Sequence, residues 1–171
     1  MDAQTSMANV DSNPWAWFDK EHSASTRFMV SGAIWALVGT FFGLFAATEY
    51  WAPDLVRILP QLQFGRIRPT HINAVAFGFI SMSTVGAIFY VIPELCRTKL
   101  YSERLANVLM IAWNAVLIAG VFCLTNGITE GREYAELPWF LDIPMFIALM
   151  TYIVIVWGTV LNRQEKQLYV T

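Results

Sequence analysis

Long apolar stretches alternate with short polar connections along this chain. Four stretches reach the roughly 20 residues that a helix needs to cross a bilayer, and they cover residues 28–51, 71–92, 105–124 and 139–161. They are too long for strands and lack strict alternation of apolar and polar positions. A helix also satisfies its own backbone polar groups, as lipid requires. The pattern therefore predicts an all-α membrane protein, with four transmembrane helices in one domain over residues 27–171.

Composition agrees with a membrane protein. The chain is 56% hydrophobic and 14% charged, whereas a soluble domain carries about 25% charged residues. Residues 1–26 are polar and mixed in charge, and they contain no basic head followed by an apolar stretch, so we interpret them as a polar tail and not as a cleaved signal peptide. Within the tail, Trp15, Trp17 and Phe18 are expected to rest at the membrane surface.

The distribution of positive charge predicts the orientation. Lysine and arginine are enriched in cytoplasmic connections. Seven of the eleven basic residues lie in the tail, the connection between the second and third stretches and the C-terminal segment, and four lie in the other two connections. Both termini are therefore expected to be cytoplasmic.

The second stretch opens with "GRIRPTHINAVAFGFI", residues 65–80, which places Arg66, Arg68 and His71 beside hydrocarbon. Pro69 is expected near the first helical position, where its missing N–H costs nothing, and His71 in the first turn. The helical face that His71 shares with residues 74, 75 and 78 is small and apolar. It suits either a large flat ligand or a neighbouring helix.

These residue types fit haem chemistry. A neutral imidazole is a good axial ligand for haem iron, and arginine pairs with carboxylates such as the haem propionates. The alternative reading of His71 is an ordinary hydrogen-bonded or interfacial histidine. The other histidine, His22, lies in the polar tail and lacks such a setting.

The connection "TNGITEGREYAELPWFLDIP" should lie on the same side as Arg66 and Arg68. Its acidic cluster includes Glu133 and Glu136, and it is either a solvated loop or a partner for a cation or for propionates. Asn114 is predicted deep in the third span, where it needs a partner. We expect that partner to be an interhelical hydrogen bond.

Several function classes have no support in the sequence. The zinc-protease, redox dithiol, P-loop and nucleophile-elbow motifs are absent, and two histidines with two scattered cysteines make no complete zinc or copper site. A disulfide between Cys96 and Cys123 is not expected, because they should lie on opposite sides. The net charge of −2 and the lack of a basic run argue against nucleic acid.

Three segments carry a resemblance to a known family. "GRIRPTHINAVAFGF" resembles the second transmembrane helix of the catalytic subunit of cbb3-type cytochrome c oxidases, the C-family of haem–copper oxidases. "GREYAELPW" is similar to that subunit's loop before helix four, and "RQEKQLYV" to the segment just after it. The segments follow in the same order, and the resemblance covers most of the chain from about residue 27.

The resemblance implies roles for particular residues. The helix-two histidine is an axial ligand to a six-coordinate low-spin haem b and matches His71. The arginine of the "RPxH" motif lies near the propionates and matches Arg68, with Arg66 beside it. The first glutamate of "EYAE" is associated with a calcium ion and matches Glu133, and the second lies in the polar region above the haems and matches Glu136.

The resemblance also implies partners and a location. The chain would be the N-terminal portion of a bundle of the twelve-helix type, in a bacterial inner membrane. The second haem ligand, the high-spin haem and the copper site would belong to the remaining part of the catalytic subunit. Electrons would come from c-type cytochrome subunits. Alone, the chain is expected to be incomplete as an enzyme, whether as a fragment, a split subunit or a truncation.

Alternatives stay open at this point. Nitric oxide reductase large subunits share the helix-two histidine in a less similar setting, so the acceptor could be nitric oxide. A cofactor-free scaffold or assembly protein is an alternative from another class. A self-contained haem b carrier would need a second ligand, such as His71 of another copy.

Overall fold

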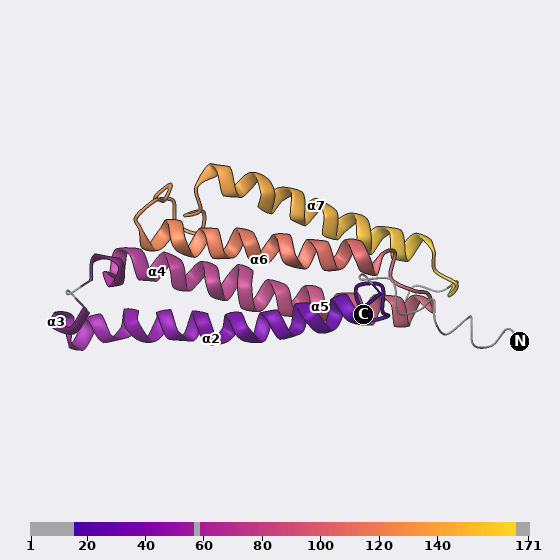
Figure 1. The fold of residues 1–171 in the computed structure, drawn as a ribbon, viewed down its shortest axis with the longest axis horizontal. Coiled ribbons are helices and arrows are strands. Elements are labelled where there is room, and N and C mark those ends of the chain that lie inside the picture. The colour runs from indigo at the N-terminus through magenta and orange to yellow at the C-terminus, as the bar shows by residue number, and fades with distance from the viewer. Residues whose placement is uncertain (1–15, 57–58, 167–171) are drawn as a thin grey trace, which may run out of the picture.

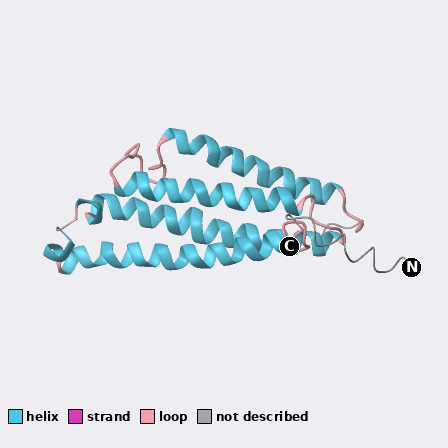
Figure 2. Ribbon diagram, viewed as in Figure 1, coloured by secondary structure: helices cyan, strands magenta, loops and turns pink. Residues whose placement is uncertain are grey.

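The structure is a computed structural model that describes residues 16–56 and 59–166. In these ranges it contains helices and no strands (Figure 2). The elements are α2 (Ser23–Trp51), α3 (Pro53–Val56), η1 (Pro60–Leu62), α4 (Phe64–Asn73), η2 (Ala74–Ile80), α5 (Ser81–Cys96), α6 (Glu103–Thr125) and α7 (Trp139–Leu161). Since α4, η2 and α5 form one continuous helix, the four predicted spanning helices are confirmed.

The helices run side by side as an elongated bundle (Figure 1). The continuous helix α4–η2–α5 packs against α2 along its length, and α6 packs on α4, α2 and α7. The first and last described residues lie at the same end of the bundle. There the ring of His22 pairs with Glu94, and the amide of Gln164 donates to the carbonyl of Cys96.

The second helix is longer than its apolar stretch. It covers Phe64–Cys96 instead of 71–92, because its first turns are polar and a hydropathy pattern registers only the part that faces hydrocarbon. The prediction for Pro69 is therefore wrong, since this residue lies inside α4 and not at its first position. His71 is correspondingly the eighth residue of the helix. Proline cannot donate a hydrogen bond to the carbonyl of Gly65, four residues earlier.

Glycines let α2 and the second helix approach closely. A Cβ built on Gly86 would lie 3.0 Å from both the backbone nitrogen of Met29 and the carbonyl oxygen of Ser25, and one on Gly32 would lie 3.0 Å from the backbone nitrogen of Ser83. Small residues at such contacts are the usual means by which helices associate in lipid. The glycines thus set the distance between the two helices.

Asn114 finds its partners on a neighbouring helix, as predicted. Its side-chain oxygen accepts hydrogen bonds from the hydroxyl of Ser31 and from the indole nitrogen of Trp35, both at 2.8 Å. Its amide nitrogen donates to the carbonyl of Met110 on its own helix. The group therefore links α2 to α6 within the apolar interior.

A second polar cluster fixes the start of α2. The carboxylate of Glu103 accepts the backbone amides of His22 and Ala24, and the buried amide of Asn107 donates to the carbonyl of Phe18. Phe18 is consequently buried, with 4% of its surface exposed, so its predicted surface position is wrong. Trp17 is exposed, and Trp15 lies outside the described residues.

The two cysteines do not form a disulfide, as expected from the sequence. Cys96 at the end of α5 and Cys123 in α6 are both free and buried.

We predict that Gly86→Val destabilises this chain, whereas Gly65→Ala does not. Valine would force backbone apart at Gly86, and overpacking of this kind typically costs about 1–3 kcal/mol. A Cβ on Gly65 meets nothing within 4 Å, so alanine there should keep or raise stability. Unfolding of both variants in detergent, followed by circular dichroism, measures the difference. Equal midpoints would contradict the close contact.

Candidate functional site

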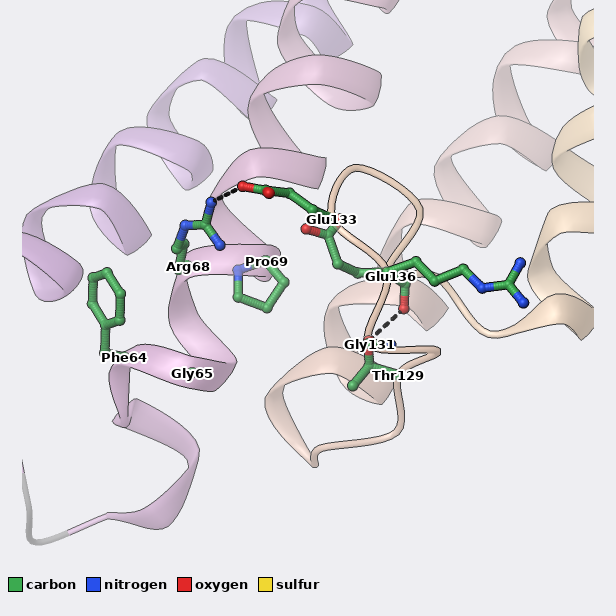
Figure 3. A pocket seen from close by; sticks show the side chains of 9 residues that line it. Phe64, Gly65, Arg68, Pro69, Thr129, Gly131, Glu133 and Glu136 are labelled. Atoms are coloured by element: carbon green, nitrogen blue, oxygen red, sulfur yellow. Dashed lines mark hydrogen bonds and ion pairs between the residues drawn. The ribbon is translucent and has the colours of Figure 1, made fainter.

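An arginine on α4 and a glutamate from the loop before α7 meet at the end of the bundle far from the described termini (Figure 3). The guanidinium of Arg68 donates to the carboxylate of Glu133 at 2.5 Å. The two side chains are 43% and 61% exposed, so water screens the pair. The structure thus brings together the basic and acidic groups that the sequence placed on one side of the membrane.

Glu136 follows Glu133 by three residues in the same loop and is buried, with 6% of its surface exposed. One carboxylate oxygen accepts a hydrogen bond of 3.1 Å from the side-chain amide of Asn73, which also donates to the carbonyl of Pro69. The backbone carbonyl of Glu136 accepts from the hydroxyl of Thr129 (Figure 3). Carboxylates are rarely buried unless they are paired, so the hydrogen bond from Asn73 holds this carboxylate, a contact that the sequence did not indicate.

Arg66 points to a different place from Arg68. Its guanidinium donates to the carbonyl of Thr125 at 3.4 Å and lies against Gly127, just past the end of α6. A cation at this position interacts favourably with the negative end of the helix dipole. The two arginines therefore do not share a carboxylate partner.

A cavity of about 310 Å³ lies between α4 and the loop, with charged groups in its wall. Its lining consists of Phe64, Gly65, Arg68, Pro69, Thr129, Gly131, Arg132, Glu133 and Glu136. Carboxylate oxygens suit a hard cation such as Ca²⁺, and guanidinium groups suit an external carboxylate. Among the described residues, no three histidine, cysteine, aspartate or glutamate side chains group closely enough to hold a metal ion.

His71 is held by the backbone of α2. Its Nδ1 lies 2.8 Å from the carbonyl oxygen of Gly39, and a carbonyl can only accept, so Nδ1 carries the proton. In the neutral imidazole, Nε2 then keeps the lone pair. In metal-bound histidines, the ring nitrogen that does not bind the metal commonly donates a hydrogen bond to a backbone carbonyl.

Gly43 makes the room that this ring orientation needs. A Cβ on Gly43 would lie 2.8 Å from Cε1 and 2.9 Å from Nδ1 of His71. Any other residue at this position would collide with the imidazole. Nothing in the sequence distinguishes Gly39 and Gly43 from the other glycines of the chain, so the sequence alone does not indicate this contact.

The small face beyond His71 packs against a helix. A Cβ on Gly39 would lie 2.7 Å from the side chain of Val75, and one on Gly78 would lie equally close to the ring of Trp35. Of the two alternatives for this face, a neighbouring helix is therefore the correct one at Val75 and Gly78. His22 lies at the opposite end of α2, so the described chain offers no second histidine near His71.

Comparisons with known proteins relate the chain to one family. The family model for cytochrome c and quinol oxidase polypeptide I matches residues 23–171. The chain is 35% identical over 144 residues to the cbb3-type cytochrome c oxidase subunit CcoN1 of Stutzerimonas stutzeri, a match that covers 84% of this chain and 30% of that protein. It is 34% identical over 142 residues to a cytochrome c oxidase subunit 1 homolog of Agrobacterium tumefaciens (strain T37), covering 83% and 26% respectively. The chain thus spans less than a third of the length of these relatives.

We predict that the buried hydrogen bond between Asn73 and Glu136 contributes more to the free energy of unfolding than the exposed ion pair between Arg68 and Glu133. Asn73→Leu should destabilise the chain by about 1–3 kcal/mol, because it leaves the buried carboxylate of Glu136 without its donor. Arg68→Ala should leave the unfolding free energy nearly unchanged, because the ion pair that it removes is screened by water. Denaturant titrations of both variants in the same detergent compare the two losses, and a larger loss for Arg68→Ala would contradict this assignment.

Proposed function

This chain belongs to the cytochrome c and quinol oxidase polypeptide I family, and we propose that it supplies one axial ligand, His71, to the low-spin haem b of a cbb3-type cytochrome c oxidase. The observation that carries the proposal is the hydrogen bond between Nδ1 of His71 and the carbonyl of Gly39. It selects the tautomer in which Nε2 is free to bind iron. Gly43 supports it by leaving space for the ring.

The charged groups at the outer end suit the rest of a haem. We propose that Arg68 faces the haem propionates, because it lies three residues before His71 on the same helical face. Arg66, whose guanidinium donates to the carbonyl of Thr125, would reach the propionates by giving up that hydrogen bond. Glu133 would bind a calcium ion beside them, and Glu136 would order the polar region above the haems. A site of this kind needs further oxygen ligands from the propionates, water or other chains, because Ca²⁺ takes six to eight.

The haem, when bound, supplies one-electron transfer. This chain's residues would orient the ring and set its potential through the Gly39 hydrogen bond and the nearby charges. The second axial ligand, the high-spin haem and copper would come from the remaining part of the catalytic subunit. Electrons would arrive from c-type cytochrome subunits, and oxygen would be the acceptor in aerobic respiration.

We propose a bacterial inner membrane with both termini in the cytoplasm. The seven-to-four distribution of basic residues supports this orientation. The common location of the first and last described residues at one end of the bundle is compatible with it. The haem site would then lie toward the periplasmic side.

We predict that His71→Ala abolishes a low-spin haem b signal, because it removes the iron ligand. The measurement is a reduced-minus-oxidised visible spectrum of membranes that hold this chain together with the remaining part of a catalytic subunit. His22→Ala is the matched control and should leave the signal unchanged. A signal that survives His71→Ala would contradict the proposal, and a signal from this chain alone would indicate a self-contained cytochrome.

We also predict that Gly43→Val weakens haem binding while the helices still form. The added side chain would displace the imidazole from the carbonyl of Gly39, and loss of the hydrogen bond that orients a metal-binding histidine typically costs about 10–100-fold in metal affinity. Haem titration of the assembled protein measures the loss. Leu37→Val, on the exposed face of α2, is the control, and equal affinities for the two variants would contradict the role of Gly43.

A further inference from the structure

A π-helix interrupts the second span within one turn of its histidine. It covers Ala74–Ile80, beginning three residues after His71. The backbone amide of Ser81 donates to the carbonyl of Ala76, five residues earlier, and the hydroxyl of Ser81 donates to the same carbonyl. Because π-helical hydrogen bonds skip one residue more than α-helical ones, the segment holds an additional residue. Such insertions are often found at functional sites.

The additional residue decides where His71 points. Each residue turns an α-helix by about 100°, since there are 3.6 residues per turn. The α5 side of the insertion is fixed by the core residues Met82, Val85 and Phe89, which are 0%, 5% and 1% exposed. Without the insertion, the part that carries His71 would be rotated by about 100° relative to α5. The imidazole would then turn away from the carbonyl of Gly39.

Two tryptophans from the neighbouring helices hold the π-helix. The indole nitrogen of Trp113 on α6, 4% exposed, donates a hydrogen bond of 3.1 Å to the carbonyl of Phe77. The ring of Trp35 on α2 lies against Gly78, where a Cβ would come within 2.7 Å of it. Trp35 is fixed in turn by its hydrogen bond to Asn114, the residue after Trp113. Two adjacent residues of α6 therefore hold the π-helix, Trp113 directly and Asn114 through Trp35.

We propose that Trp113 is a positioning residue for the haem ligand. Its indole N–H stabilises the π-helical conformation by satisfying the carbonyl of Phe77, and the π-helix in turn aims the ring of His71 at Gly39. The assignment rests on the proposed role of His71 as a haem ligand. Trp113 acts through the backbone of the second span, to which it donates at Phe77.

The test uses the two histidines of the chain as separate reporters. With 15N-labelled histidine, solid-state NMR of the full chain in bilayers gives ring-nitrogen signals from His71 and His22 only. Trp113→Phe keeps a large ring but removes the N–H donor. It should shift the His71 signals and leave those of His22 in place. Trp157→Phe, on the exposed face of α7, is the matched control and should change neither.

Unchanged His71 signals in a folded Trp113→Phe chain would overturn the proposal. A measurement on the unsubstituted chain covers the case in which the variant does not fold. With 15N-tryptophan and carbonyl-13C-phenylalanine, the chain should show a through-space contact between an indole nitrogen and a phenylalanine carbonyl, and absence of this contact would also overturn it.

The assembled protein separates this inference from the haem proposal. With the remaining part of a catalytic subunit and haem, Trp113→Phe should shift the g-values of the low-spin haem in electron paramagnetic resonance, while Trp157→Phe should not. If the unsubstituted chain carries no haem on His71, the proposed function fails, and the NMR comparison still decides whether Trp113 positions the ring.

Discussion

The hydrogen bond between His71 and the carbonyl of Gly39 is the contact on which the arrangement of the candidate site depends. It forms only because α2 and the second span approach closely, and that approach requires glycine at positions 39 and 43. The same contact fixes the imidazole tautomer, which determines the nitrogen that is available to a metal. Helix packing and ligand chemistry are therefore set by the same few atoms.

Three asparagine side chains in the bundle each join separate elements. Asn114 links α6 to α2, Asn107 links α6 to the segment before α2, and Asn73 links α4 to the loop through Glu136. Unsatisfied polar groups are costly where water is absent, so these links make the relative positions of the helices specific. One oxygen of Glu49, in contrast, is buried without a hydrogen-bond partner, and nothing among the described residues accounts for it.

Much of the fold could be predicted from the sequence, because about 20 apolar residues in a row have few structural alternatives in a bilayer. The start of the second helix could not be predicted, because its first turns are polar and a hydropathy pattern does not register polar turns. The π-helix was also invisible, because every residue of "AVAFGFI" is apolar or glycine and an additional residue leaves no change in the pattern. Motif and charge identified His71, Arg68 and Glu133, whereas Asn73, Gly39 and Gly43 act through contacts that only the packed helices reveal.

Whether Nε2 of His71 binds the haem iron can be measured directly. This chain, labelled with 15N-histidine, can be assembled with haem and an unlabelled remaining part of a catalytic subunit, and the oxidised low-spin haem studied by pulsed electron paramagnetic resonance. We expect strong hyperfine coupling to a single 15N ligand, which disappears in His71→Ala. Coupling to 14N ligands only, in a protein that holds its haem, would contradict it.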